Sequence, residues 1–176
     1  MWKTLSTKEI LKHPRLTVIE DEFETEKGIR GKYLHYKHDK NVAFLLCKRA
    51  DGKMLLQKEY CYPSKEKYFM LPGGAVPLDE KIGDGANREL MEEAGFRADS
   101  LELLGNYSLN IRKSKGLVYV FLATDLKEAS LPGDPEEEIE TYWFNEDEIE
   151  QKIINGDIHD PNILAAWTLY KLKKTF

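Results

Sequence analysis

One 23-residue segment constrains the fold more than any other part of the sequence. It runs from Gly74 to Phe96 and reads GAVPLDEKIGDGANRELMEEAGF. If residues 84–94 are helical, three carboxylates share one face at positions i, i+3 and i+4: Glu89, Glu92 and Glu93. An apolar stripe suited to packing on a sheet lies opposite: Ala86, Leu90 and Ala94. Gly95 is suited to ending this helix, because glycine readily adopts a positive φ.

The acidic face of this helix needs an explanation, because carboxylates within one turn repel each other. The cost is a few tenths of a kcal/mol for each like-charged pair on an exposed helix. Mg²⁺ prefers oxygen ligands and takes one or two carboxylates together with water and phosphate oxygens. Beside a glycine-rich turn, the face is suited to binding Mg²⁺ and phosphate. Taken alone, however, a glutamate-rich helix is more often a solvated surface.

The spacing of the whole segment distinguishes these alternatives. Every specified position resembles the Nudix box, G-x5-E-x7-R-E-U-x-E-E-x-G-U, in which U is a bulky apolar residue. The resemblance implies an α+β fold, in which a mixed sheet is sandwiched by helices and the box forms a loop, a helix and a second loop. It also implies a hydrolase, in which metal-activated water attacks a phosphorus atom of a nucleoside diphosphate linked to another group.

The resemblance also implies roles for individual residues. The metal ligands would be Glu89 and Glu93, with the Gly73 carbonyl as a further ligand and Glu92 as both a ligand and a catalytic residue. Mg²⁺ is the expected ion, with Mn²⁺ as a substitute. Arg88 is expected to orient a box carboxylate, and Glu80 to hold the loop against the helix. Because Gly83 and Gly85 are poor helix formers, the helix is expected to begin near Asp84.

The rest of the chain reads as strands followed by helices. A basic segment at 4–13 is expected to be helical, and residues 16–25 and 32–38 to form strands on either side of a turn at Gly28–Gly31. Two apolar runs, 42–48 and 53–60, flank Ala50-Asp51-Gly52 and predict a hairpin. Strands are expected near 101–110, 116–126 and 140–145, and helices at 147–157 and from Asp160-Pro161 onward. We expect a single domain, 1–176, with an N-terminal antiparallel strand extension (1–38) and a catalytic core (39–176).

Features outside the box resemble the ADP-ribose and nucleoside-diphosphate-sugar pyrophosphatase branch of the family. These are the N-terminal strands, the turn Leu71-Pro72-Gly73-Gly74, and an acidic loop that precedes a strand and two helices. In that branch the acidic loop often supplies the general base. The candidates here are Glu136, Glu137 and Glu138, with Glu137 slightly preferred among the three. For each of them a solvated acidic turn is the open alternative.

Two departures from the pattern of this branch argue against ADP-ribose itself as the substrate. The branch commonly has Gln-Tyr-Arg before the Leu-Pro-Gly-Gly turn, where this chain has Glu59-Tyr60-Cys61. A proline-containing loop past the box is replaced by Asn110-Ile111-Arg112-Lys113. Arg112 is therefore a candidate to replace the missing positive charge, and Tyr60 a second substrate-binding candidate.

The function expected from the sequence is Mg²⁺-dependent hydrolysis of a nucleoside diphosphate sugar, similar to ADP-ribose, to a nucleoside monophosphate and a sugar phosphate. Three alternatives stay open: hydrolysis of another nucleoside diphosphate derivative such as a dinucleoside polyphosphate, an isomerase of the same fold, and a non-catalytic nucleotide sensor. Non-catalytic relatives typically lose box carboxylates, and this chain keeps them all.

Charge and composition limit the partners. The net charge of −5 gives no basic footprint for nucleic acid, so no nucleic-acid partner is expected. The sequence has no apolar run of about 18 residues that would span a membrane, and its start does not resemble a signal peptide. We therefore expect a cytoplasmic protein without a membrane partner. The branch is usually dimeric through its N-terminal strands and end helix, which implies a symmetric homodimer.

Overall fold

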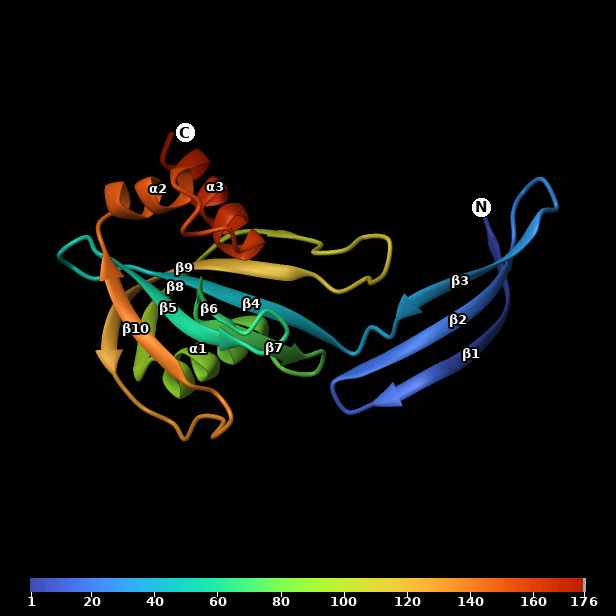
Figure 1. Cartoon of the computed structure of the whole chain (residues 1–176), viewed down its shortest axis with the longest axis horizontal. Coiled ribbons are helices and arrows are strands. Elements are labelled where there is room, and N and C mark those ends of the chain that lie inside the picture. Colours follow the sequence, from blue (N-terminus) through green and yellow to red (C-terminus); the bar gives the residue numbers. More distant parts are fainter. Residues whose placement is uncertain (176) are drawn as a thin grey trace. The chain divides into compact units, whose positions relative to one another are not determined.

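The computed structural model describes residues 1–175, which form two compact units. Unit 1 comprises residues 1–39 and 108–117, and unit 2 comprises residues 40–107 and the chain from 118 onward. The strands of unit 1 are β1 (Lys3–His13), β2 (Leu16–Glu24) and β3 (Arg30–Tyr36). Unit 2 contains the remaining elements shown in Figure 1: β4 (Lys40–Cys47), β5 (Met54–Cys61), β6 (Glu66–Met70), β7 (Gly73–Pro77), α1 (Ile82–Glu93), β8 (Phe96–Tyr107), β9 (Val118–Glu128), β10 (Ile139–Phe144), α2 (Glu146–Ile154) and α3 (Pro161–Thr175).

Unit 1 is built on a three-stranded antiparallel sheet in the order β1-β2-β3. The helix expected at 4–13 is therefore wrong. These residues pair with β2 from Lys3 opposite Glu24 to His13 opposite Leu16, with two irregularities in register. Helix propensity is a weak preference, and pairing with a long neighbouring strand overrides it. The strand pair expected around the Gly28–Gly31 turn is confirmed as β2 and β3.

Unit 2 contains two sheets and all three helices. One sheet has the order β7-β4-β9-β8, with β4 and β9 parallel and the other pairs antiparallel. The second sheet has the order β10-β5-β6 and is antiparallel. This arrangement confirms the expected α+β fold with a mixed sheet.

The hairpin predicted across Asp51-Gly52 is only partly correct. The turn exists, but β4 and β5 lie in different sheets and are joined by a single bridge between Lys48 and Met54. Each strand already has neighbours on both sides, β7 and β9 for β4, and β10 and β6 for β5. The two apolar runs therefore diverge after the turn instead of pairing with each other.

Successive side chains of β4 belong to two different buried clusters, one on each face of the strand. Leu46 belongs to a buried cluster with side chains of α2 and α3, including Ile149, Ile163 and Trp167. Leu45, the next residue along the strand, belongs to a second cluster with Leu90 of α1. Because successive side chains of a strand point to opposite faces, α1 covers one face and α2 and α3 cover the other, as Figure 1 shows.

Helix α1 packs closely on β7. It begins at Ile82, two residues earlier than expected, so that Gly83 and Gly85 both lie within the helix. Close packing requires the second of these glycines. A Cβ at Gly85 would lie 2.7 Å from both Val76 methyl groups. The C-terminal end follows the prediction, since the helix ends at Glu93 and Gly95 has a φ of 72°.

Helices α2 and α3 are both capped by side chains. The Asn145 backbone nitrogen donates to the Glu148 carboxylate at 2.7 Å in a capping box. Asp160 accepts from the backbone nitrogens of Asn162 and Ile163, each at 3.0 Å, with Pro161 in the first turn as expected. Within residues 1–175, no helix has the length and apolar character needed to span a bilayer.

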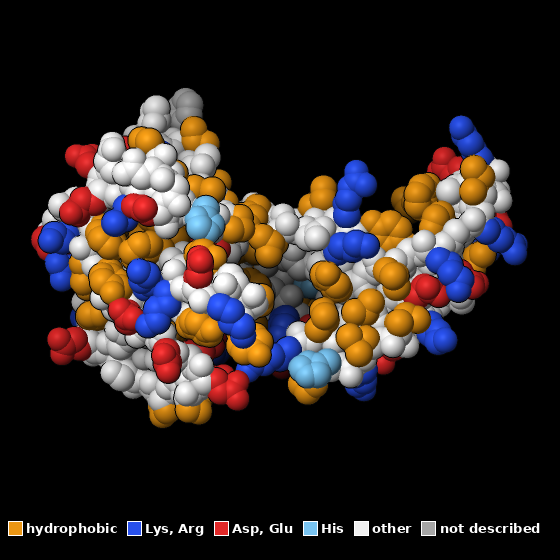
Figure 2. Space-filling model, in the orientation of Figure 1, with side chains coloured by type: hydrophobic (Ala, Val, Ile, Leu, Met, Phe, Trp, Pro, Cys, Tyr) orange, Lys and Arg blue, Asp and Glu red, His pale blue; other side chains and the backbone are white. Residues whose placement is uncertain are grey.

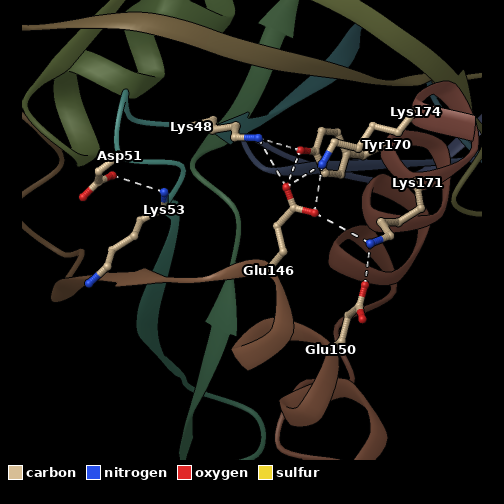
Figure 3. Close-up of polar contacts among 8 residues, drawn as sticks. All are labelled: Lys48, Asp51, Lys53, Glu146, Glu150, Tyr170, Lys171 and Lys174. Carbon is tan, nitrogen blue, oxygen red and sulfur yellow. Dashed lines mark hydrogen bonds and ion pairs between the residues drawn. The ribbon is translucent and has the colours of Figure 1, made fainter.

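Glu146 at the start of α2 ties three elements together (Figure 3). Its carboxylate accepts from Tyr170 Oη at 2.7 Å and Lys174 Nζ at 2.8 Å, both on α3, and from Lys48 Nζ, just after β4, at 3.3 Å. Burial alone would raise the pKa of Glu146, but the hydrogen bonds from Lys174, Tyr170 and Lys48 outweigh it and lower this pKa to about 2. The ionised carboxylate therefore stabilises the packing of α2 on α3.

We predict that Glu146→Gln lowers the free energy of unfolding by about 2 kcal/mol at pH 7. The folded pKa is below the usual value of 4.5, so the stabilisation is complete above that value and is lost as the pH falls toward 2. The difference between the variant and the wild type should therefore shrink over this range in denaturant titrations. Glu150→Gln is the matched control, because Glu150 shares Lys171 as a partner but is more exposed, and should cost under about 1 kcal/mol. Equal losses in the two variants would contradict the role of Glu146.

Candidate functional site

Arg88 on α1 lies at the centre of the motif identified in the sequence. Its Nη1 lies 2.8 Å from Glu89 Oε1 and donates to Glu92 Oε2 at 3.0 Å. Its Nη2 donates to Glu80 Oε2 and to the Ala75 carbonyl oxygen on β7, each at 3.3 Å. One guanidinium thus bonds three motif carboxylates and fastens the loop around Glu80 to the helix, as expected for Arg88 and Glu80.

Within residues 1–175, no Lys, Arg or His side chain forms an ion pair with Glu93, and Glu93 is more deeply buried than Glu89. Glu93 Oε2 accepts from the Gly73 backbone nitrogen at 3.0 Å. Burial raises the pKa of Glu93 to about 8, the hydrogen bond from the Gly73 nitrogen and the nearby Gln57 amide oppose this rise, and the charges of Glu89 and Glu137 add to it. A carboxyl group in this setting is stabilised in its ionised form by a nearby cation.

Glu89 lies between the helix and the glycine turn. Burial raises its pKa, and the contacts with Arg88 partly offset this effect. A Cβ added to Gly74 would lie 2.7 Å from Glu89 Oε2, so only glycine leaves room for this carboxylate. Glu89 and Glu93 are one turn apart and flank the Gly73–Gly74 segment.

The donor set suits a hard divalent ion. Glu89, Glu92, Glu93 and the carbonyl of Gly73 would supply oxygen ligands, and a bound ion would stabilise the ionised form of Glu93, whose pKa burial raises. In the arrangement described for residues 1–175, no three acidic, histidine or cysteine side chains already converge on a metal position. The reason lies in Arg88, which holds the Glu89 and Glu92 carboxylates on its own side.

The acidic loop between β9 and β10 docks on the end of α1. The Ala129 nitrogen donates to the Gly95 carbonyl at 3.0 Å, and the Leu131 nitrogen to the Met91 carbonyl at 3.1 Å. The charge of Glu137 raises the pKa of Glu93, so these two side chains are electrostatic neighbours. Glu138 acts instead on Lys67 of β6, whose pKa its charge helps to raise. Glu136 is exposed, and its backbone nitrogen donates to Asp134 Oδ1 at 2.9 Å.

The two candidate substrate-binding residues lie in different units. Tyr60 is near the end of β5 in unit 2 and is 43% exposed. Arg112 belongs to unit 1 and lines a cavity of about 540 Å³ with Trp2, Phe23 and Tyr33, whose hydroxyl donates to the Arg112 carbonyl at 2.6 Å. The roles of both residues in substrate binding stay predictions.

The sequence analysis missed Gln57. This residue of β5 is 3% exposed, and its amide lies near enough to Glu93 to lower the pKa of that carboxyl. A single amide after the apolar run Met54-Leu55-Leu56 was the available signal. A polar residue within a buried strand indicates a specific partner, because an unpaired amide is costly to bury.

Comparison with known proteins covers most of the chain. A family model described as NUDIX domain matches residues 37–167. The ADP compounds hydrolase NudE of Escherichia coli (strain K12) is 28% identical over 142 residues, which cover 80% of this chain and 76% of that protein. The ADP-ribose pyrophosphatase of Bacillus subtilis (strain 168) is 24% identical over 174 residues, which cover 98% of this chain and 94% of that protein.

Two further matches differ in their coverage. The diphosphoinositol polyphosphate phosphohydrolase 3-beta of Bos taurus is 36% identical over 92 residues, which cover 51% of this chain and 54% of that protein. The crystal structure of an ADP compounds hydrolase has a TM-score of 0.88 at 22% identity and covers 97% of this chain and 92% of that chain. The structural match shows the same fold over nearly the whole length.

We predict that Glu93→Gln stabilises the metal-free protein at neutral pH. The folded pKa of about 8 is above the usual 4.5, so ionising Glu93 destabilises the wild type as the pH rises between these values. The gain in the variant should be about 3 kcal/mol at pH 7 and near zero at pH 4. Thermal unfolding in a chelator at several pH values measures this difference. A variant that is equally or less stable at pH 7 would refute the assignment of Glu93 as a buried carboxylate without a cation.

Proposed function

Because the chain belongs to the Nudix family of pyrophosphohydrolases, we propose that it hydrolyses the pyrophosphate bond of a nucleoside diphosphate sugar. The products would be a nucleoside monophosphate and a sugar phosphate, and the reaction would require Mg²⁺, with Mn²⁺ as a substitute. The observation that carries this proposal is the arrangement of Glu89 and Glu93 against Gly73 and Gly74, with the charge of Glu137 acting on Glu93.

The substrate class is supported by how much of the chain each relative covers. The protein named ADP-ribose pyrophosphatase aligns with 98% of the chain, including the N-terminal strands. The diphosphoinositol polyphosphate enzyme aligns with only 51%. Cys61, where the branch commonly has an arginine, favours a nucleotide sugar related to ADP-ribose over ADP-ribose itself.

Residues of unit 2 would supply both the metal ligands and the general base. Glu89, Glu92, Glu93 and the Gly73 carbonyl would hold the ion, while Arg88 keeps the motif loop and helix together. Glu137 would accept a proton from the attacking water. The water oxygen would form a bond to one phosphorus atom as the bridging P–O bond breaks, and the other phosphate would leave with its substituent. Glu136 and Glu138 are the alternative bases. When bound, the divalent ion would neutralise phosphate charge and lower the pKa of a bound water.

We further propose a symmetric homodimer that uses the N-terminal strands. Every residue of β1 is exposed, and Figure 2 shows hydrophobic side chains distributed over the sheet of unit 1. Among them are Leu5, Ile10 and Leu11 of β1, with exposed fractions of 39–50%. Apolar surface of this kind commonly marks a protein interface. The cytoplasmic location expected from the sequence also stays a prediction.

We predict that a panel of substrates with Mg²⁺ or Mn²⁺ gives the highest kcat/KM on a nucleoside diphosphate sugar. The panel contains ADP-ribose, ADP-glucose, GDP-mannose, UDP-glucose, diadenosine polyphosphates and deoxynucleoside triphosphates. Product analysis should find a nucleoside monophosphate and a sugar phosphate in equal amounts. Preference for a diadenosine polyphosphate would replace the proposed substrate, and no turnover of any compound would favour a non-catalytic nucleotide sensor.

Glu137→Gln should lower kcat on the best substrate by about 10²- to 10⁴-fold with a small change in KM, because it removes the proposed general base. Glu138→Gln is the matched control, since the charge of Glu138 acts on Lys67 and this variant should keep most of its activity. Full activity in the Glu137 variant would remove it from the mechanism. Loss in the Glu138 variant alone would move the base to that residue.

For the oligomer, light scattering should give twice the chain mass of 20.4 kDa. Leu5→Lys combined with Ile10→Lys should shift the protein toward the monomer, because both changes place charge on the exposed apolar surface of β1. The double variant Lys8→Leu and Lys12→Leu keeps the strand and should remain dimeric. A monomeric wild type at micromolar concentration would contradict the proposed homodimer.

A further inference from the structure

Gln57 is an anomaly in the interior of unit 2. Among residues 1–175 it is the one polar side chain in the fully buried class, with 3% of its surface exposed. Its Nε2 makes no hydrogen bond of standard geometry. Because a buried donor without a partner destabilises a fold, such a group is retained where it serves another purpose.

The position of Gln57 in β5 explains where its amide points. Its backbone pairs with Thr141 of β10 on one side and Met70 of β6 on the other, so the strand cannot rotate to expose it. Gln57 shares a strand face with Leu55, which packs in the cluster that contains α1. Leu56 faces the opposite cluster, with α2 and α3. The amide is therefore directed to the side of the sheet that α1 covers.

The group that Gln57 meets on that side is the Glu93 carboxylate. The amide lies close enough to lower the pKa of Glu93, which opposes the effect of burial. The Gly73 backbone nitrogen already donates to Glu93 Oε2 at 3.0 Å. One donor holds a single oxygen and leaves the carboxylate plane free to turn, whereas a second donor from another strand restricts its orientation.

We propose that Gln57 is a positioning residue: its Nε2 lies beside the Glu93 carboxylate in the metal-free protein, and would donate to that carboxylate and orient it when a divalent ion is bound. The inference rests on the proposed metal site at Glu93 and adds a residue outside the motif to it. In metal sites, groups that hydrogen-bond to the ligands commonly change metal affinity by about 10- to 100-fold when they are removed. Gln57 would act in this way from a neighbouring sheet.

A purely structural role for Gln57 predicts a different result from the same substitution. Methionine has a similar length and shape but no amide, so Gln57→Met removes the donor and fills the same space. If Gln57 serves only packing, methionine replaces it and the variant keeps its metal affinity. If Gln57 orients Glu93, the metal-free variant is as stable as the wild type or more stable, because an unsatisfied donor has been removed, while metal affinity falls.

The experiment measures Mn²⁺ binding to the full chain by electron paramagnetic resonance without substrate, and thermal unfolding in a chelator. Gln57→Met should weaken Mn²⁺ binding about 10- to 100-fold without lowering the metal-free unfolding temperature. Gln57→Leu provides a second apolar replacement. Gln151→Met is the matched control, because Gln151 is the only other glutamine in the chain and lies exposed on α2.

Two outcomes separate the role of Gln57 from the existence of the metal site at Glu93. Wild-type Mn²⁺ affinity in both Gln57 variants, combined with its loss in Glu93→Gln, would overturn the role of Gln57 and leave the metal site standing. A wild type that binds no Mn²⁺ would overturn both. As a kinetic check, the Mg²⁺ concentration for half-maximal activity should rise in Gln57→Met, and kcat at saturating Mg²⁺ should recover most of its wild-type value.

Discussion

The contact between Arg88 and three carboxylates sets the charge balance on which the site depends. The guanidinium lies within 3.4 Å of oxygens from Glu80, Glu89 and Glu92. It compensates only part of their charge and does not pair with Glu93, which is held by the Gly73 backbone nitrogen. The result is an acidic face whose most buried carboxyl, Glu93, resists ionisation because burial raises its pKa. A divalent ion is the simplest group that would stabilise the ionised form of Glu93 and also bring a phosphate to it.

The fold provides this rigidity through close contact between backbone elements. Gly85 lets α1 approach the Val76 side chain, and Gly74 leaves room for the Glu89 carboxylate. The acidic loop is attached to the end of α1 by two backbone hydrogen bonds, which bring Glu137 within electrostatic reach of Glu93. Helix α1 therefore meets β7 and the acidic loop mainly through backbone contacts and close packing at glycines. Such preorganisation suits a site that must bind a charged group and direct a water at it.

Much of this arrangement follows from local sequence. Glu89 and Glu93 are four residues apart, so a helix places them together, and Gly95 ends that helix as expected. The N-terminal segment was wrongly expected to be helical, because the pairing of β1 with β2 depends on a partner that local propensity does not reveal. The separation of β4 and β5 into two sheets likewise depends on distant strands. Gln57 was missed for the same reason, since its partner Glu93 lies 36 residues away in the sequence and only the packed fold brings them together.

The central claim is that the acidic face of α1 binds a divalent ion through Glu89 and Glu93. The most direct measurement is a crystal structure of the protein soaked with Mn²⁺, in which anomalous scattering locates the ion independently of the refined coordinates. The account predicts a strong anomalous peak with carboxylate oxygens of Glu89 and Glu93 at about 2.0–2.3 Å, as for other hard divalent ions. A peak bound elsewhere, with both carboxylates still held by Arg88 and Gly73, would contradict it.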